Sequence, residues 1–411
     1  MVSGINSKRL KVVWLCHFAN EEMKNYFGTP HVAEMAPWIN NLIQIFQDRT
    51  DIELYVVAPN LFTNRDSRFE KNEVSYFFYK RIPLPTNNKY VRGIYSLLKI
   101  DEITNYNWVK RKIVNVIQKI DPDIIHLHGA ENPYYSAGIL PVLKQYPTLI
   151  TIQGFIRSVS KINYNIKKRI EIEEAILKGT KHIGVRTDEM SEMALEINPR
   201  ATLHIHNYPI AIPTLVKTNI GKEEPIDCLF FARVTKDKGI EDLLKAISIV
   251  KNTYPKISVS VIGGTSKSYF AYLKTLCTRL SIEDNVDFLG FLPTHEDICK
   301  FVLHSKMCVL PTYYDIIPGT IVESMYMKLP IVAYAVGGIP ELNRKETTVM
   351  LVDKHDINQL AEKIIQVLTD TELRKELADK AYIHVHERFD NSKVANDIIN
   401  AYQSILEENF L

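Results

Sequence analysis

The feature of this sequence that most constrains its fold is a repeated alternation of short apolar runs with longer amphipathic stretches. The strand-like runs of the first half lie at 10–16, 52–58, 123–129, 148–154 and 182–187, with an amphipathic stretch at 32–46. Those of the second half lie at 227–232, 257–264, 286–291, 307–312 and 331–338, with helical patterns near 239–252 and 267–280. Near-continuous apolar runs separated by helices are typical of parallel strands buried on both faces. The sequence therefore predicts an α/β protein with two doubly wound, Rossmann-like domains.

The boundary between these domains is expected between residues 207 and 225, where three prolines and the tetrapeptide GKEE interrupt both patterns. The final helical stretch has no strand after it, and we expect it to pack back across the boundary. The predicted parts are a first domain at 1–210, a linker at 211–225, a second domain at 226–389 and the final helix at 390–411.

The composition is that of an ordinary soluble protein, with 46% hydrophobic and 24% charged residues. No apolar run reaches the roughly 18 residues that a membrane-spanning helix needs. The first 30 residues lack the apolar core and cleavage site of a signal peptide, so we expect a cytoplasmic protein. The five cysteines are scattered and contain no C-x-x-C pair, which predicts reduced core thiols rather than disulfides or a zinc ribbon.

Positive charge is concentrated in the first half of the chain. Residues 1–210 contain 27 Lys and Arg against 21 Asp and Glu, and the remainder contains 23 against 27. Basic triplets occur at 110–112 and 167–169. This asymmetry suggests peripheral contact with an anionic membrane, and no nucleic-acid partner is expected. Solvated helix faces explain either triplet equally well.

A turn from loop into helix at Pro318-Gly319 predicts an anion site. The amides of Gly319, Thr320 and Ile321 would lack partners within the helix, and the helix dipole favours a diphosphate there. Glu323 lies in the first helical turn and Asp315 precedes it by eight residues. Carboxylates at these positions suit sugar hydroxyls, although a dipole-favoured acid and a loop cap are the alternative interpretation.

Two cations follow the strand at 227–232. Arg233 and Lys238 share one loop before the next helix, at the edge where parallel sheets bind ligands. They would neutralise a diphosphate and stabilise it as a leaving group, or they are simply exposed loop cations. Gly263-Gly264 and Gly290-Phe291 end the two following strands, where glycine permits close backbone approach to a ligand or forms a plain turn.

In this order, the segments resemble the C-terminal domain of the GT-B glycosyltransferases, specifically the retaining enzymes of family 4, over about residues 226–411. The family's glycine-arginine-x4-lysine-glycine signature matches residues 232–239, and its glutamate-x7-glutamate motif matches Asp315-x7-Glu323. Ala232 replaces the usual glycine. Asp315 is one methylene shorter than the usual glutamate, which leaves the donor sugar open.

The resemblance implies a role for each matched residue. Arg233 and Lys238 would bind the donor diphosphate, Glu323 the ribose, and Asp315 the transferred sugar. The other implied donor-binding residues are Gly263, Gly264, Phe291, Pro318, Gly319, Thr320 and Ile321. The resemblance also implies two domains facing each other across a cleft, with the last helix touching the first domain.

The first half resembles the family's acceptor domain less closely. His126 and His128 lie two residues apart in a predicted strand and should point to the same side. The resemblance places the histidine of the reaction centre at His128, which we expect to reach the crevice at the strand's carboxyl end. A histidine packed under a loop is the alternative. Weaker candidates are Arg186, Asp188, Gly28 and Thr29.

The implied activity is retaining, metal-independent transfer of a sugar from a nucleoside-diphosphate sugar to a glycan or lipid-linked acceptor. Such reactions serve capsular, exopolysaccharide or lipopolysaccharide synthesis, and no cofactor is required. The alternatives are a same-fold sugar-nucleotide epimerase or hydrolase, or a non-catalytic partner subunit. Three H-x-H pairs also raise a metallohydrolase hypothesis. It is disfavoured because His384 and His386 fall in a helical stretch, where a two-residue spacing faces opposite ways.

Overall fold

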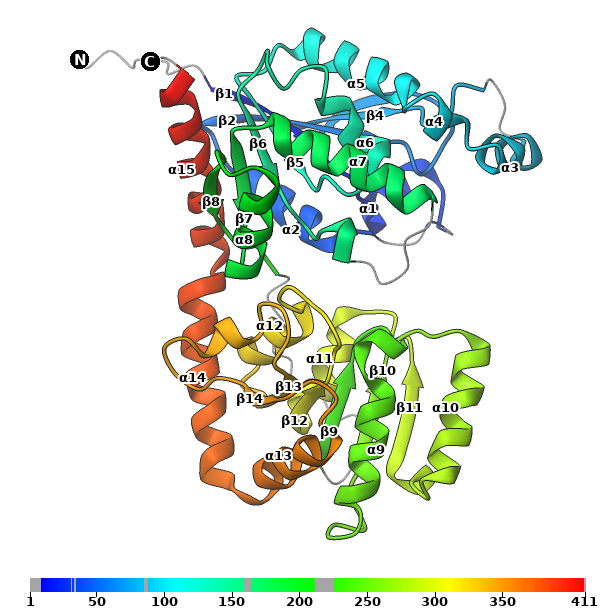
Figure 1. The fold of residues 1–411 in the computed structure, drawn as a ribbon, viewed down its shortest axis with the longest axis vertical. Helices are drawn as coiled ribbons and strands as arrows, with labels where there is room; N and C mark the ends of the chain where they lie inside the picture. Colours follow the sequence, from blue (N-terminus) through cyan, green and yellow to red (C-terminus); the bar gives the residue numbers. More distant parts are fainter. Residues whose placement is uncertain are drawn as a thin grey trace. The chain divides into compact units, whose positions relative to one another are not determined.

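The computed structural model describes residues 9–30, 32, 35–84, 88–158, 164–210 and 225–409. The chain forms two compact units, which are considered one at a time (Figure 1). The first unit comprises Met1–Pro209 with Asn391–Leu411, and the second comprises Ile210–Asp390. The linker expected at 211–225 lies, except for Pro225, outside the described residues.

The first unit is built on an eight-stranded sheet with the order β3-β4-β2-β1-β5-β6-β7-β8. Every pairing is parallel except that of β3 with β4. The strands are β1 (Leu10–Leu15), β2 (Ile52–Pro59), β3 (Ser67–Lys71), β4 (Val74–Tyr79), β5 (Ile124–His128), β6 (Thr148–Thr151), β7 (His182–Val185) and β8 (Thr202–Ile205). Its helices are α1 (Glu21–Phe27), α2 (Pro37–Phe46), α3 (Lys89–Leu97), α4 (Ile100–Ile103), α5 (Asn107–Ile120), α6 (Pro133–Ser136), α7 (Tyr164–Gly179), α8 (Asp188–Ile197) and α15 (Asn391–Asn409).

The second unit contains a six-stranded, entirely parallel sheet with the order β11-β10-β9-β12-β13-β14. Its strands are β9 (Ile226–Phe231), β10 (Val259–Ile262), β11 (Val286–Gly290), β12 (Ser305–Leu310), β13 (Ile331–Tyr334) and β14 (Met350–Val352). Its helices are α9 (Ile240–Val250), α10 (Lys267–Arg279), α11 (His295–Leu303), α12 (Gly319–Tyr326), α13 (Ile357–Thr369) and α14 (Thr371–Phe389). The prediction of two Rossmann-like α/β domains is confirmed.

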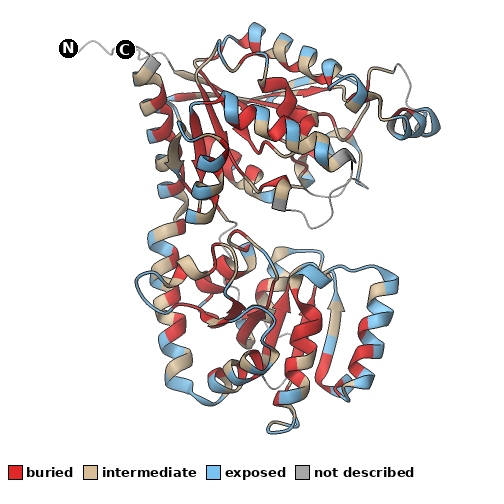
Figure 2. Cartoon of the chain, in the orientation of Figure 1, coloured by how far each residue is buried: buried red, intermediate tan, exposed pale blue. Residues whose placement is uncertain are grey.

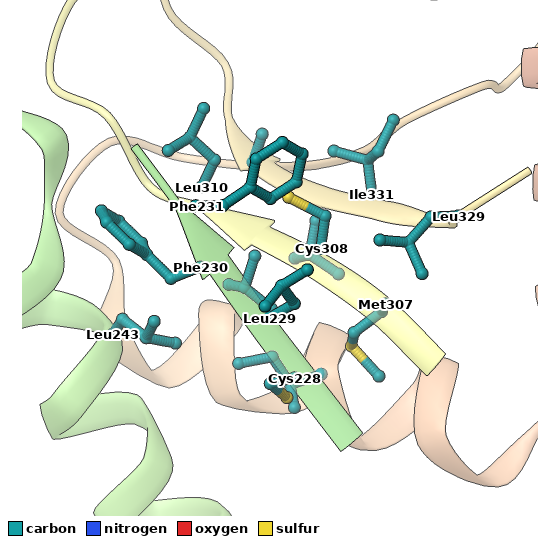
Figure 3. Close-up of a cluster of buried hydrophobic side chains, with 14 of the residues drawn as sticks. Cys228, Leu229, Phe230, Phe231, Leu243, Met307, Cys308, Leu310, Leu329 and Ile331 are labelled. Carbon is teal, nitrogen blue, oxygen red and sulfur yellow. The ribbon is translucent and has the colours of Figure 1, made fainter. Parts of the chain in front are cut away.

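Each sheet is buried because helices cover both of its faces (Figure 2). In the second unit, Phe230 on β9 and Cys308 on the neighbouring β12 are both fully buried in one apolar cluster (Figure 3). All five cysteines are free and buried, as the sequence predicts. Within the described ranges, no helix combines the length and apolar content needed to cross a membrane.

Helix α15 belongs to the core of the first unit. Val394, Ile398 and Tyr402 lie in the same apolar cluster as Trp14 of β1. The indole N–H of Trp14 donates to the Tyr402 hydroxyl over 3.0 Å. The end of the chain therefore packs against the strand that begins the fold.

The predicted helix at 32–46 is shorter than expected. It begins only at Pro37, because Ala36 adopts a left-handed conformation (φ 51°) that a helix cannot continue. The antiparallel pairing of β3 with β4 at the edge of the sheet was not predicted.

Candidate active site

The loop after β9 and the loop after β12 meet at the carboxyl edge of the second sheet. Lys238 ends a short 3-10 helix (Lys236–Lys238), and its ammonium forms an ion pair with the carboxylate of Asp315. Both side chains are mostly buried, with exposures of 15% and 23%. Arg233, in the same loop as Lys238, is exposed. The fold thus joins two predicted site residues that lie far apart in the sequence.

The start of α12 supplies backbone donors at this edge. Among the described residues, no hydrogen-bond acceptor contacts the amides of Gly319 and Thr320, which follow Pro318. The prediction for Ile321 is wrong. Its amide donates to the carbonyl of Pro318 over 3.0 Å, and its side chain is fully buried in the core. The predicted anion site would therefore have two available amides rather than three.

Two glycines allow the loops at this edge to pack tightly. Gly263 has φ 145°, and a Cβ atom there would overlap the carbonyl oxygen of Ala232 at the end of β9. Gly337 has φ 54°, and a Cβ atom there would overlap the carbonyl oxygen of Asp315. Since L-residues rarely adopt these conformations, the site loops depend on glycine at both positions.

The remaining predicted donor residues lie at the ends of β10 and β11. The amide of Gly263 donates to the carbonyl of Gly290 over 2.8 Å, which holds the two strand ends together. Gly264 is exposed, with no atom near the position of a Cβ. Phe291 follows Gly290 and is 78% exposed. An exposed aromatic ring at this edge offers a face on which a nucleobase could stack.

His295 contacts Glu323 and was not predicted from the sequence. Its Nε2 lies 3.3 Å from a carboxylate oxygen of Glu323, and its Nδ1 lies 3.7 Å from the sulfur of Cys299. Hydrogen bonds to Cys299 and then to Glu323 raise the pKa of His295 to about 10. The imidazole is therefore charged at neutral pH and holds the Glu323 carboxylate. Nothing in the local sequence marks this contact, because it depends on the packing of α11 beside α12.

His128, the predicted histidine of the reaction centre, is fully buried in the first unit. Its ring lies 3.7 Å from that of His126 and 4.8 Å from that of Trp14, measured between ring centroids. The two histidines point to the same side, as predicted. The side chain of His128 has no exposed surface, and Trp14 and His126 pack against its ring. Burial, followed by the charge of His206, lowers its pKa well below the usual value.

A hydrogen-bonded cluster surrounds these rings. Tyr402 contacts Nδ1 of His126 over 2.6 Å, and Thr151 contacts Nε2 over 2.7 Å. The hydroxyl of Thr151 also lies 2.9 Å from Nε2 of His206. Both ring nitrogens of His128 and Nδ1 of His206, in contrast, are buried without a hydrogen-bond partner among the described residues. Because buried polar groups of a structural core are normally paired, the role predicted for His128 stays a prediction.

Arg186 lies close to the backbone of His128. Its guanidinium donates to the carbonyl of Gln153 over 3.0 Å, and the Gln153 amide donates to the carbonyl of His128 over 2.8 Å. Nearby, Glu131 accepts a hydrogen bond from the Tyr135 hydroxyl over 2.9 Å, and burial raises its pKa. Glu131 was not predicted, although it follows His128 by only three residues.

The other weak candidates lie at helix ends. Asp188 is exposed in the first turn of α8, where the helix dipole favours an acid. Gly28 adopts φ 63° and ends α1 by donating to the carbonyl of Asn25. Thr29 follows it in the same turn, and its amide donates to the carbonyl of Lys24.

A pocket of about 330 Å³ lies in the first unit, between α3–α4 and the segment after β5. Its lining residues are Tyr95, Lys99, Ile100, Asp101, Glu102, Tyr106, Asn132, Pro133, Tyr134 and Arg169. Asp101 accepts a hydrogen bond from the Tyr95 hydroxyl over 2.7 Å, and burial raises its pKa. Lys99 and Tyr106 both adopt left-handed backbone conformations. Such strain is most often retained at binding sites. No motif in the sequence marks this pocket.

The metallohydrolase hypothesis gains no support from the described part of the chain, which contains no cluster of three or more His, Cys, Asp or Glu side chains placed to hold a metal. His384 and His386 both lie in α14, as the sequence predicts for that pair.

Comparison with known proteins places these observations in context. Residues 214–384 match the family of glycosyl transferases group 1. A teichuronic acid biosynthesis glycosyltransferase of Bacillus subtilis, TuaC, is 23% identical over 96% of this chain and 99% of its own length. The N-acetyl-alpha-D-glucosaminyl L-malate synthase of Bacillus anthracis is 22% identical over 82% of this chain and 91% of its own length.

Solved structures support the fold. Sucrose-phosphate synthase of Thermosynechococcus elongatus gives a TM-score of 0.72 at 18% identity, covering 97% of this chain and all of its own. Anabaena HepE in complex with UDP gives 0.68 at 15% identity, covering 96% of this chain and all of its own. The fold is therefore that of the GT-B glycosyltransferases, and the second unit carries the sequence pattern of glycosyl transferases group 1.

Proposed function

We propose that this protein transfers a sugar from a nucleoside-diphosphate sugar to a glycan or lipid-linked acceptor during bacterial cell-surface polysaccharide synthesis. The observation that carries the proposal is the gathering of Lys238, Asp315 and Arg233 with the free amides of α12 at one sheet edge. The names of relatives support it, since TuaC is described as a teichuronic acid glycosyltransferase. HepE has been crystallised with UDP and with UDP-glucose.

The cations of this edge suit a departing diphosphate. Arg233, Lys238 and the amides of Gly319 and Thr320 would face the negative charge that grows on the phosphate as the glycosidic bond breaks. The Asp315 carboxylate holds the Lys238 ammonium in place. Because the cation is positioned before the donor binds, little reorganisation is needed during the reaction.

The carboxylates of this edge suit hydroxyl groups. Glu323, held by His295, would accept hydrogen bonds from the ribose, and Asp315 would accept them from the sugar. Asp315 is a poor nucleophile because its charge is shared with Lys238. We therefore expect retention without a glycosyl-enzyme intermediate. The bond from the anomeric carbon to the diphosphate breaks, the acceptor oxygen bonds on the same face, and its proton passes to the departing phosphate. No metal ion is assigned to this reaction.

The pocket of the first unit suits the acceptor. Tyr134, which is half-buried, offers an aromatic ring to a sugar, while Asp101 and Asn132 offer acceptors for hydroxyls. The positive charge of the first half further suggests that the acceptor lies at an anionic membrane.

The test begins with a panel of nucleotide sugars, where a bound donor should raise the melting temperature. Lys238→Ala should weaken binding of the matching nucleoside diphosphate by about 10- to 150-fold, the loss of one charge-assisted contact of about 1.5–3 kcal/mol. Lys236→Ala, an exposed lysine of the same short helix, is the matched control. Unchanged affinity in Lys238→Ala would place the diphosphate elsewhere.

The chemistry is tested on the product. NMR should show a transferred sugar with the anomeric configuration of the donor, in the presence of EDTA as in its absence. An inverted product would overturn the retaining mechanism, EDTA inhibition would overturn metal independence, and release of free sugar alone would indicate a hydrolase.

A further inference from the structure

The segment α3–α4 exposes an unusual concentration of large apolar side chains. Within the described residues, six of the exposed large hydrophobics lie between positions 90 and 103. They are Tyr90, Val91, Ile94, Leu97, Leu98 and Ile103. Tyr90, Leu97 and Ile103 are each more than 70% exposed. Figure 1 shows α3 standing out from the body of its unit, and Figure 2 shows its surface mainly in the colour of exposed residues. A contiguous group of this kind marks an interaction surface, whereas scattered apolar residues do not.

The helix is oriented so that its apolar face points outward. Tyr90, Ile94 and Leu97 share one face, because residues three and four apart lie together on a helix. Tyr95 points the other way, is 95% buried, and donates its hydroxyl hydrogen to Asp101 in the pocket. Tyr95 therefore anchors α3 to the protein while the apolar face remains uncovered.

The sequence around this face is basic. Residues 89–112 contain six Lys and Arg against two acids, and one of those acids, Asp101, is buried. The basic triplet of α5 lies close to that of α7. Burial is the main cause of the lowered pKa of Lys110, and the nearby charge of Lys168 is the second cause. Three members of the triplets have other contacts: Lys112 pairs with Asp66, Lys168 with Glu171, and Arg169 donates to the Glu131 carbonyl. The triplets alone are thus a weaker membrane site than the sequence suggested.

We propose that α3–α4 is an interfacial docking surface for an anionic lipid bilayer, formed by Tyr90, Ile94, Leu97, Leu98 and Ile103. The apolar face would enter the boundary between headgroups and acyl chains, with the neighbouring cations against the anionic headgroups. A second copy of the chain fits less well, because self-association through this face would bring two positively charged regions together.

Docking through α3 also positions the pocket. Tyr95 lines the pocket from the inner side of the helix whose outer side meets the lipid. The pocket therefore lies at the bilayer surface, where the glycan of a lipid-linked acceptor is found. This consequence rests on the proposed function, whereas the docking itself does not.

Sedimentation of the full chain with vesicles tests the proposal. Wild-type protein should bind vesicles of equal phosphatidylglycerol and phosphatidylcholine, and should bind pure phosphatidylcholine much less. The double variant Ile94→Ser/Leu97→Ser should reduce partitioning at least tenfold. Ile383→Ser is the matched control, because Ile383 in the second unit is as exposed as Ile94, at 58% and 57%, and it should bind like the wild type. All substituted positions are exposed, so melting temperatures should be unchanged.

The docking surface would be overturned if the wild type did not bind vesicles, if it bound both vesicle types equally, or if Ile383→Ser lost binding as strongly as the double variant. It would also be overturned if, without lipid, the wild type were a dimer and the double variant a monomer. Transfer to a water-soluble acceptor separates this proposal from the proposed function. The double variant should retain that activity. If the wild-type protein lacks transfer activity but binds vesicles, the transferase assignment is refuted and the docking surface is not.

Discussion

His128 and His206 of the first unit and His295 of the second unit differ in the direction of their pKa shifts. In the first unit, burial lowers the pKa of His206 to about 3 and that of His128 well below its usual value, so both rings are neutral. In the second unit, contacts with Cys299 and Glu323 raise the pKa of His295 to about 10. Desolvation disfavours the charged form, whereas a neighbouring carboxylate favours it.

This difference indicates what each histidine can do. In the first unit, the neutral ring of His126 joins β5 to α15 through its contact with Tyr402. A charged histidine beside a partly exposed carboxylate fixes the direction of that carboxylate. Consequently, the histidine that the resemblance suggested is buried with unpaired ring nitrogens, and the one that it did not suggest contacts a predicted site residue.

The largest expected effect is a selective loss of the first unit in mild acid. Six of its histidines have lowered pKa values in the fold. The pKa is about 4 for His17 and His182 and about 3 for His206, and it is also lowered for His126, His128 and His204. A group with a lowered pKa contributes stability above the unfolded value of 6.5, and that stability is lost as the pH falls toward 4. Three buried carboxyl groups with raised pKa values oppose this trend: Asp101, Glu131 and Glu173.

Tryptophan fluorescence measures this effect directly, because all three tryptophans, Trp14, Trp38 and Trp108, lie in the first unit. The melting temperature followed by fluorescence should fall between pH 6.5 and pH 4.5, before most carboxylate ion pairs titrate near pH 4. A fluorescence transition that is constant across this range would mean that the histidine cluster is not linked to folding.

A smaller effect is expected at the glycines of the second unit. Gly263→Ala places a Cβ atom against the carbonyl oxygen of Ala232 in a left-handed conformation, and should destabilise the unit by more than about 1 kcal/mol. Gly264→Ala meets no neighbouring atom and should leave the melting temperature unchanged. Thermal melting of the two variants compares them directly. Equal stability would show that the close approach at Gly263 relaxes without cost.

The smallest effect concerns His295. Its raised pKa contributes stability that is complete below pH 6.5 and is lost as the pH rises through about 10. Wild-type protein should therefore melt lower at pH 9.5 than at pH 7, and His295→Gln should reduce this difference. His386→Gln, at an exposed position of α14, serves as the control. If His295→Gln keeps the full alkaline decrease, the contact with Glu323 does not hold the charge.

Features that depend on neighbouring residues were predicted from the sequence, whereas most contacts between distant segments were not. Strands such as β9 and β12 were predicted because their apolar runs are continuous. Arg233 and Lys238 share one short loop and were found on their spacing, and their role stays a prediction. The sequence does not distinguish the exposed apolar face of α3, because a face exposed to solvent has the same periodicity as one that is buried. The contact of His295 with Glu323 was missed because it joins two helices.

What the sequence determined by itself is the alternation of strands and helices, the two-domain α/β architecture and the motifs that contain Lys238 and Asp315, because each depends on local periodicity or on a short motif. The tertiary structure decided which side chains are accessible. It buried His128 beneath Trp14, occupied the Ile321 amide, paired Lys238 with Asp315 and left α3 uncovered. Burial and pairing are properties of segments distant in the sequence, so their effects on charge and contact emerge only when the chain is folded.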